Sequence, residues 1–397
     1  MKIGILTFHR PANFGANLQA YSSMCYLSSL GHEVKVIDYV RQTDFDYKNK
    51  VDIRQYEAHK HFVETRLSLT KQITTDEDLC RIVKEEAFDA IVIGADAVWR
   101  SPKDNNIYFA EWLFKDKDIK DVAVASISPA HMGNGYYNIS DDKRQAIHEC
   151  LSKFKYITVR DAWTKEVVNR DIFGGETFVR NVNPDPVFTL FRFIDDEQWN
   201  NCGQKSKGYY LMSLPKNWVN VGKFADKKRK WFAQFKAYVN GAGYKLVELP
   251  IPEGKSGMKF DYTIDYPIDP LQWFLWIKNA KAFCGLRFHA IVSSISNGTP
   301  FYSIDSYGDN GRTAKMLDLV GLHKMARKRD VKSKIYNLLK GSTLEKNRCG
   351  AMIECESPKK IFSILESTNS MDVIKFRDGN LSVFDKNMSE MLKAISK

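Results

Sequence analysis

This sequence lacks the features that define several large classes of protein. No stretch approaches the roughly 18 apolar residues that a membrane-spanning helix requires, so any contact with a membrane would be peripheral. The seven cysteines are scattered, with no Cys-x-x-Cys pair and no His/Cys cluster at zinc-ligand spacing. We therefore expect reduced thiols in a cytoplasmic protein, which at most touches the inner face of a membrane. The first residues, MKIGILTFHR, contain no long apolar core and predict a strand, not a signal peptide.

The common nucleotide-binding and nucleic-acid-binding motifs are also missing. The loop after the first predicted strand holds one glycine, whereas a dinucleotide-binding fingerprint needs Gly-x-Gly-x-x-Gly. No RNA- or DNA-binding signature is present, so we expect no nucleic-acid partner. The basic cluster at residues 227–230 is interpreted as a solvated helix start.

The composition is that of an ordinary globular protein. The chain has 397 residues, of which 44% are hydrophobic and 27% charged, which excludes disordered, collagen-like and low-complexity classes. This length is too great for one core and fits two α/β domains of roughly 200 residues each. The 59 Lys and Arg residues against 48 Asp and Glu leave a net charge of +11. That excess favours anionic partners, which are phosphorylated substrates, nucleic acid or an anionic membrane surface, and does not choose among them.

Apolar runs and helical patterns alternate along the chain. A strand at 2–8, a helix at 18–30 and a strand at 34–39 form a β-α-β unit, which predicts a parallel sheet. The first half continues with strands at 90–94, 122–127 and 156–159 and helices at 77–87 and 141–154. Residues 41–75 are poorly periodic and are interpreted as an insertion or a helical excursion.

The pattern restarts after a charged stretch without apolar period at residues 195–208. The second half shows strands at 209–214, 245–249, 282–285 and 301–304 and helices at 230–240, 271–279 and 290–296. We therefore predict two Rossmann-like α/β domains that face a cleft, at residues 1–198 and 205–397, the second ending in a helical tail.

Candidate binding residues follow the first predicted strand. The segment TFHRPANFGA contains His9, Asn13 and Gly15. A loop at this point lies against a helix N-terminus, which favours an anion or a sugar hydroxyl. The alternative is a structural loop in which His9 caps neighbouring backbone.

Two further strand ends carry polar residues. Gly94 would let the backbone approach a ligand closely, and Asp96 could accept a proton or hydrogen bond from a hydroxyl. The alternative is a tight turn with Asp96 as a helix N-cap and Trp99 as a packing residue. Arg160 directly follows a buried strand and suits bidentate recognition of carboxylate or phosphate. Its alternative is a salt bridge to Asp161 or to another acid.

The most specific pattern is AFCGLRFHA, in which a strand ends and a helix of small residues begins. Arg287 and His289 alternate here beside a helix N-terminus, which can bind an oxyanion and supply a titratable imidazole. The alternative for His289 is helix capping. Arg312 follows another loop and is a further candidate for substrate binding.

Taken together, these segments resemble the polysaccharide pyruvyl transferase family. The resemblance covers about residues 2–325 in the family's order, through TFHRPANFGANLQAYS, LGHEVKVIDY, FDAIVIGADAVW, YITVRDA, NPDP and AFCGLRFHAIVSSISNGTPFYSID. It implies a two-domain fold like that of GT-B glycosyltransferases. It also implies transfer of the enolpyruvyl unit of phosphoenolpyruvate onto sugar hydroxyls, which forms a pyruvate ketal and releases phosphate.

The resemblance also implies roles for individual residues. Arg160 and Arg287 match the arginines that hold the carboxylate and phosphate of the donor, and His289 matches the acid/base histidine. The family uses a histidine of the first domain as well, and we nominate His131. Asp96 is a candidate base for the acceptor hydroxyl.

No cofactor beyond the phosphoenolpyruvate donor is expected, and no carboxylate cluster suggests a metal site. The expected acceptor is a sugar of a surface-polysaccharide precursor, either free or carried on a lipid. Two alternatives stay open, a GT-B glycosyltransferase that uses a nucleotide sugar and a non-catalytic homologue that binds sugar or phosphate.

Overall fold

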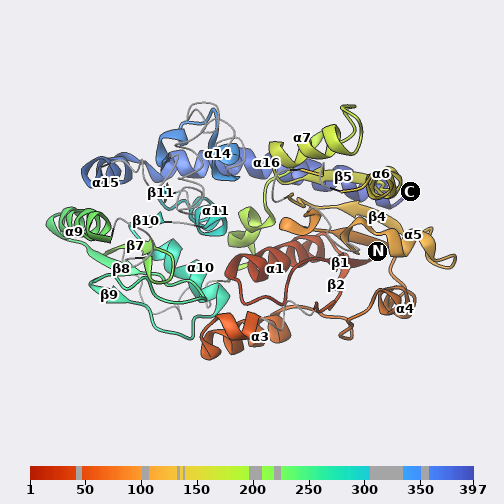
Figure 1. The fold of residues 1–397 in the computed structure, drawn as a ribbon, viewed down its shortest axis with the longest axis horizontal. Helices are drawn as coiled ribbons and strands as arrows, with labels where there is room; N and C mark the ends of the chain where they lie inside the picture. Colours follow the sequence, from red (N-terminus) through yellow and green to blue (C-terminus); the bar gives the residue numbers. More distant parts are fainter. Residues whose placement is uncertain are drawn as a thin grey trace. The chain divides into compact units, whose positions relative to one another are not determined.

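The computed structural model describes residues 1–41, 47–100, 107–131, 135–136, 139–195, 208–218, 225–285, 287–304, 334–349 and 357–397. The chain divides into two compact units (Figure 1). Unit 1 comprises Met1–Tyr47, His59–Phe193 and Asn380–Lys397, and unit 2 comprises Lys48–Ala58 and Ile194–Gly379.

Unit 1 is built on a parallel sheet with the strand order β2-β1-β3-β4-β5-β6. The strands are β1 (Lys2–Leu6), β2 (Glu33–Val36), β3 (Ala90–Ile93), β4 (Ala123–Ser126), β5 (Tyr156–Val159) and β6 (Asn181–Val182). Its helices are α1 (Phe14–Ser29), α4 (Asp76–Glu86), α5 (Glu111–Lys115), α6 (Asp141–Ser152) and α7 (Ala162–Asp171), with 3-10 turns η2 (Ala97–Trp99), η3 (Ile107–Phe109) and η4 (Pro186–Phe193).

Unit 2 contains a second parallel sheet, with the order β12-β11-β10-β7-β8-β9. Its strands are β7 (Tyr209–Ser213), β8 (Lys245–Glu248), β9 (Tyr262–Thr263), β10 (Ala282–Gly285), β11 (Phe301–Ile304) and β12 (Arg348–Cys349). Its helices are α9 (Ala225–Gly241), α10 (Pro270–Asn279), α11 (Phe288–Ser296), α14 (Lys334–Leu339) and α15 (Pro358–Ser367), with the 3-10 turn η7 (Glu345–Asn347). The predicted α/β class with two parallel sheets is therefore confirmed.

Three elements lie where the chain passes from one unit to the other. The 3-10 turn η1 (Tyr47–Lys50) and helix α3 (Ile53–Arg66) fill part of the region that the sequence left as an insertion or helical excursion, and helix α16 (Ser370–Ile395) ends the chain. Of the helices in the described ranges, none is both long and apolar enough to cross a membrane.

The C-terminal helix corrects the predicted division of the chain. The sequence places residues 205–397 in one domain, but the last part of α16 packs in unit 1. Polar contacts fix it there: the Tyr156 hydroxyl donates to Glu390 at 2.7 Å and the Asn387 amide donates to Asn183 at 3.1 Å. Sequence periodicity cannot show this, because a helix that leaves one unit for another keeps the same pattern.

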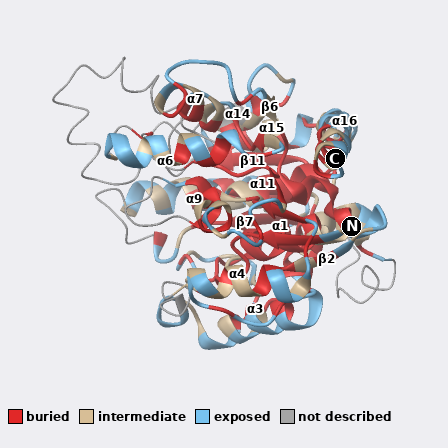
Figure 2. Cartoon of the chain, turned by 90° about the vertical axis from the view of Figure 1, so that its right-hand side faces the viewer, coloured by how far each residue is buried: buried red, intermediate tan, exposed pale blue. Residues whose placement is uncertain are grey.

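Apolar strands form the centre of each unit. Every residue of β3, β4, β7, β10 and β11 is buried, as expected for parallel strands covered on both faces. Figure 2 shows the buried strands and the exposed outer faces of helices such as α3 and α6. The near-continuous apolar runs in the sequence are therefore a reliable signal for these strands.

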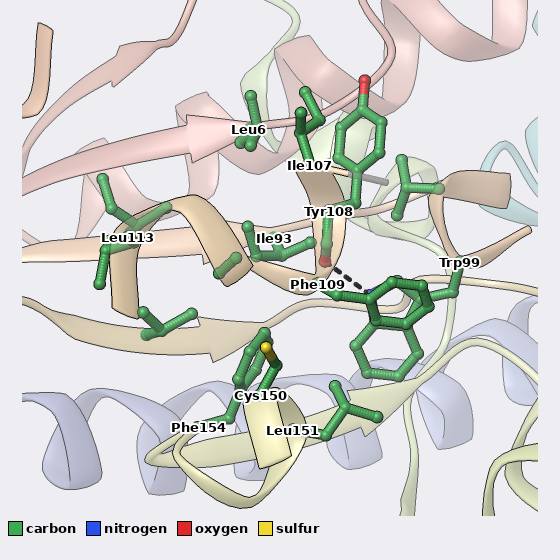
Figure 3. Packing of buried hydrophobic residues seen from close by; sticks show 14 of the residues in the cluster. Leu6, Ile93, Trp99, Ile107, Tyr108, Phe109, Leu113, Cys150, Leu151 and Phe154 are labelled. Carbon is green, nitrogen blue, oxygen red and sulfur yellow. Dashed lines mark hydrogen bonds between the residues drawn. The ribbon is translucent and has the colours of Figure 1, made fainter. Parts of the chain in front are cut away.

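Aromatic side chains complete the core beside β3. Trp99 is fully buried, its indole N–H donates to the Tyr108 carbonyl at 3.0 Å, and its ring lies 5.9 Å from that of Phe109 (Figure 3). Burial of one large apolar side chain stabilises a protein by about 1.5–3 kcal/mol. The packing role that the sequence offers as an alternative for Trp99 is the one that the structure shows.

The strand order reverses once in each sheet. In unit 1, β2 lies on one side of β1 and β3 lies on its other side. In unit 2, β8 lies on one side of β7 and β10 lies on its other side. At such a switch point, the loops that leave the carboxyl ends of the two adjacent strands diverge and open a crevice where ligands of α/β proteins commonly bind. The loops that contain His9, Gly94 and Arg287 all begin at these two positions.

Close approach of the backbone at these strand ends requires glycine. Gly94 has a φ of +114°, and a Cβ atom there would overlap the Ile127 carbonyl oxygen. A Cβ atom at Gly285 would likewise overlap the backbone of Ser213. Each loop therefore begins where the end of its strand lies very close to the backbone of a neighbouring segment.

We expect Gly94→Ala to destabilise the protein by at least about 2 kcal/mol, because the methyl group meets backbone that cannot move aside and the positive φ disfavours alanine. The measurement is the free energy of unfolding from denaturant titration. Gly379→Ala is the matched control, since Gly379 lies inside α16 and an added methyl group there would have nothing within 4 Å. It should stabilise the protein by about 0.5–1 kcal/mol. Equal effects of the two substitutions would contradict this account.

Candidate active site

The loop between β1 and α1 is ordered by a helix cap. The Asn13 side chain accepts hydrogen bonds from the backbone N–H groups of Gly15 at 3.0 Å and Ala16 at 3.3 Å. Because this cap satisfies donors of the first turn, α1 begins at Phe14, four residues before the predicted start. Asn13 and Gly15, which the sequence predicts to bind substrate, serve the helix start in this structure.

His9 and Arg10 share one buried carboxylate. His9 Nε2 lies 2.9 Å from Asp38 Oδ1, and Arg10 donates to both Asp38 oxygens, from Nε at 2.8 Å and from Nη2 at 2.5 Å. His9 Nδ1 lies 3.1 Å from the Thr7 carbonyl oxygen, so both ring nitrogens face acceptors. Both ring nitrogens are therefore in contact with groups of the protein. His9 thus takes the structural role that is its alternative in the sequence analysis.

The surroundings of Asp38 determine its protonation. Burial alone would raise the pKa of the Asp38 carboxyl, but the hydrogen bonds and charges of Arg10 and His9 lower it to about 2. Asp38 is therefore ionised at neutral pH. It follows the second strand, within the segment LGHEVKVIDY.

Gln19 of α1 joins the loops that follow β1 and β3. Its amide nitrogen donates to Thr7 Oγ1 at 2.9 Å and to the Phe8 carbonyl at 2.8 Å. Its amide oxygen accepts from the Ala95 N–H at 3.1 Å. These bonds hold the two loops of the first switch point in one arrangement.

A second amide, Asn17, connects the same loop to α3. Asn17 Nδ2 donates to the carbonyl oxygens of His9 and Pro11, which fixes the amide orientation, so that its oxygen accepts from His59 Nδ1 at 2.5 Å. Burial lowers the pKa of His59 to about 3, and the ring is therefore neutral. Like Gln19, Asn17 thus uses its side chain to hold the loop.

The ends of β3, β5 and β6 bring two acids to Arg160. Its Nη1 lies 3.0 Å from Asp185 Oδ2 and 3.3 Å from Asp96 Oδ1, and the guanidinium is almost fully buried. Burial would lower the pKa of Arg160, but the charges of Asp96 and Asp185 raise it. With both acids ionised, this group of three side chains has a net charge of −1. A salt bridge is the alternative that the sequence offers for Arg160, although Asp161 is not the partner, since it caps α7 through Thr164.

Asp96 itself has two further tasks in the backbone. It adopts a φ of +66°, a conformation that costs free energy in a residue with a side chain, and its carboxylate accepts from the Ala97 N–H at 2.7 Å. Its carbonyl oxygen accepts from Ala130 N–H at 2.7 Å. The capping role and the pairing with Arg160 therefore coexist, and a role as base for the acceptor hydroxyl stays a prediction.

Both ring nitrogens of His131 have partners within the protein, and the catalytic role for which it is nominated stays a prediction. Its Nδ1 lies 2.9 Å from the Trp99 carbonyl oxygen and its Nε2 accepts from the Gly135 N–H at 3.1 Å. This pattern is that of a neutral ring with the proton on Nδ1, and burial lowers the pKa of His131. Both nitrogens would have to leave these partners before the ring could exchange a proton with a substrate.

Arg287 and His289 lie at the second switch point. Arg287 occupies the N-cap position of α11 with a φ of +83° and no capping bond from its side chain, and His289 is in the first turn. The Arg287 side chain is 46% exposed, and its Nη2 donates to Glu253 Oε1 at 2.8 Å. An exposed guanidinium at a helix start suits an anionic ligand. Arg312 lies outside the described residues.

The structure also identifies residues that the sequence analysis missed. Asp38, Asp185 and Glu253 hold His9, Arg160 and Arg287 respectively. Asp38 and Asp185 have a signal, their places in the LGHEVKVIDY and NPDP segments, whereas Glu253 has none. In the part of the chain that the structure describes, no group of three or more His, Cys, Asp or Glu residues is placed to hold a metal ion.

We expect Asp38→Asn to lower stability in a pH-dependent way. A carboxyl whose pKa is lowered on folding stabilises the protein above its unfolded pKa, and the effect is lost as the pH falls toward the folded value of about 2. The difference in unfolding free energy between the wild type and the variant should be about 2 kcal/mol at pH 7 and should shrink between pH 5 and 2.

The control for this experiment is Asp226→Asn. Asp226 is exposed and pairs with Arg229 within one helical turn, an arrangement that contributes little to stability. If the Asp38 variant showed the same small and pH-independent difference as this control, the ion pair of Asp38 would have no importance for folding.

Comparison with known proteins begins with overall structure. No curated protein sequence is significantly similar to this chain. Among solved structures, it is similar to UDP-GlcNAc 2-epimerase from Methanocaldococcus jannaschii, with 11% identity, 81% of this chain and 88% of that chain covered, and a TM-score of 0.45. It is also similar to the glycosyltransferase SnogD from Streptomyces nogalater, with 11% identity, 99% of each chain covered and a TM-score of 0.46. These values are too low to carry an inference about this chain.

The sequence itself is more informative. The model of the family described as polysaccharide pyruvyl transferase matches residues 13–307, about three quarters of the chain. The match includes Asp96, Arg160, Arg287 and His289. The chain belongs to the polysaccharide pyruvyl transferase family.

Proposed function

We propose that this protein transfers the enolpyruvyl unit of phosphoenolpyruvate to two hydroxyls of a sugar in a surface-polysaccharide precursor, on the cytoplasmic side of the membrane. The observation that carries the proposal is the family match over residues 13–307, which includes the turn that holds Arg287 and His289. The half-exposed guanidinium of Arg287 supports it, because phosphoenolpyruvate has two anionic groups that need fixed positive charge.

The proposed reaction begins with protonation of C3 of the donor, which leaves an oxocarbenium-like C2. One sugar hydroxyl attacks C2 and loses its proton, the bond from C2 to the phosphate oxygen breaks, and a second hydroxyl attacks and loses its proton. Of the two protons released by the hydroxyls, one balances the proton gained at C3 and the other leaves with phosphate. The products are a pyruvate ketal and hydrogen phosphate.

His289 and Arg287 have separate roles in this proposal. An imidazole can give a proton and take it back near neutral pH, so His289 is the proposed acid/base group. Arg287 is the proposed ligand for an anionic group of the donor, because its fork can form two parallel hydrogen bonds. No step of the proposal requires a cofactor or metal ion.

The direct test is incubation of the protein with phosphoenolpyruvate and a panel of free and lipid-linked sugars. Phosphate release should depend on the presence of the correct acceptor, and mass spectrometry should show the ketal on that sugar. Transfer of a sugar from a nucleotide sugar to the same acceptors, with no use of phosphoenolpyruvate, would replace this proposal with a glycosyltransferase.

We expect His289→Ala to lower kcat by about 10²–10⁴-fold with little change in the affinity for phosphoenolpyruvate, since the imidazole acts on the proton and not on the donor's charge. Steady-state kinetics and calorimetric donor binding measure the two effects. His61→Ala, an exposed histidine of α3, is the control and should have no effect. Wild-type turnover in the His289 variant would remove this residue from the mechanism.

We expect Arg287→Lys to weaken binding of phosphoenolpyruvate about tenfold, because an ammonium group keeps the charge but loses the bidentate fork. The measurement is the dissociation constant from calorimetry. Arg54→Lys is the matched control, since Arg54 also pairs with an acid on the surface of unit 2. Unchanged binding in the Arg287 variant would mean that the donor is held elsewhere.

A further inference from the structure

The guanidinium of Arg287 already has an anionic partner from its own chain. Glu253 Oε1 accepts from Arg287 Nη2 at 2.8 Å, and the two side chains are 29% and 46% exposed. The two residues are 34 positions apart and both belong to unit 2. A carboxylate therefore lies where an anionic ligand of Arg287 would bind.

Glu253 is presented by a tight turn. Ile251 and Gly254 form an antiparallel bridge, and the Gly254 N–H donates to the Ile251 carbonyl at 2.9 Å. Pro250 and Pro252 restrict the backbone on either side of Ile251. Because the turn is fixed, Glu253 stays near Arg287 even when the ion pair opens, and this gives it a high effective concentration there.

The pairing of Glu253 is incomplete. Its second oxygen, Oε2, is buried and has no hydrogen-bond partner among the residues that the structure describes. An ion pair exposed to this degree stabilises a protein by only about 0–1 kcal/mol. The contact is therefore weak enough for a ligand to open, while it still reduces the charge that Arg287 offers.

We propose that Glu253 is an internal competitor for Arg287, which weakens the binding of anionic ligands and speeds the release of phosphate. This inference rests on the proposed function, in which Arg287 holds an anionic group of the donor. Binding of the donor displaces the Glu253 carboxylate from Arg287. After phosphate has formed, the carboxylate binds Arg287 again and displaces the phosphate. No covalent step is involved.

A competitor on one guanidinium has a defined thermodynamic signature. It lowers the affinity for every anion that binds Arg287. In the absence of charge repulsion, the factor equals one plus the equilibrium constant for formation of the ion pair. From the stability range of exposed pairs, this factor is about two- to sixfold. When Glu253 has been displaced from Arg287, its negative charge repels an anion bound there. The factor for phosphate is therefore at least as large as that for a monoanion such as pyruvate.

The test compares Glu253→Gln with the wild type. We expect the dissociation constant for inorganic phosphate, measured by calorimetry, to fall about two- to sixfold. In turnover assays, the KM for phosphoenolpyruvate and the inhibition constant for phosphate should fall by a similar factor, while kcat should not rise. A residue with a merely structural role would not shift both constants together in this direction.

Three further variants make the result specific. Asp265→Asn removes an exposed acid of unit 2 that pairs with Lys255, and should leave the phosphate affinity unchanged. Glu253→Asp keeps the charge but shortens its reach, and should fall between the wild type and Glu253→Gln. Combined with Arg287→Lys, the Glu253→Gln substitution should lose most of its effect, because the competition needs the Arg287 fork.

A readout without any ligand tests the ion pair itself. Phenylglyoxal modifies accessible arginines, and peptide mass spectrometry can follow Arg287 alone. We expect Arg287 to react about two- to sixfold faster in Glu253→Gln than in the wild type.

The outcomes separate this inference from the proposed function. Unchanged or weaker phosphate binding in Glu253→Gln, or equal tightening in Asp265→Asn, would overturn the inference even if pyruvyl transfer is observed. Tighter phosphate binding and faster Arg287 modification, in a protein that never consumes phosphoenolpyruvate, would support the inference and reject the proposed reaction.

Discussion

The arrangement of polar groups in this protein depends on one constraint, the edge at which parallel strands end. Parallel strands deliver all their following loops to the same edge of the sheet, and a reversal of strand order separates two of those loops. The backbone must pass very close to a neighbouring strand there, which Gly94 and Gly285 permit. Once the strand ends are held in this way, the first residues of each loop have little freedom, and residues such as Asp96 and Arg287 take strained positive φ values.

The two units use their polar side chains differently at this edge. In unit 1, His9, Asp38 and Arg10 form one buried group and Arg160, Asp96 and Asp185 form another. Buried charges are expensive unless they are paired, so these groups must be satisfied within the protein whenever the unit is folded. Arg287 of unit 2 is instead half exposed, so its ion pair can open at little cost. Burial, rather than residue type, therefore distinguishes Arg160 from Arg287.

Sequence reasoning could predict the strands and the loops that carry the site, because apolar runs and the residues after them are local features. It could not predict the partners of these residues. Asp38 contacts His9 because β2 lies beside β1, and Asp185 contacts Arg160 because β6 lies beside β5. Local periodicity in the sequence does not determine the strand order. The same reason explains α16, whose pattern continues unchanged while the chain passes from unit 2 to unit 1. The start of α1 is predicted wrongly for a different reason. Asn13 is a capping signal in the sequence, but the prediction follows the apolar spacing, which begins four residues after Phe14.

Both arginines that the family resemblance connects with the donor are held by carboxylates of the protein. Among the residues that the structure describes, Asp96 and Asp185 pair with Arg160, and Glu253 pairs with Arg287. In the proposed reaction, an anionic donor that binds either guanidinium therefore competes with a carboxylate of the protein. At Arg160 such an exchange has to begin with Asp96, whose side chain is 15% exposed and whose 3.3 Å contact is the longer of the two, because Asp185 is fully buried. Exchange at Arg287 requires only that the partly exposed carboxylate of Glu253 turn away, so the proposed donor would displace a carboxylate more easily from Arg287 than from Arg160.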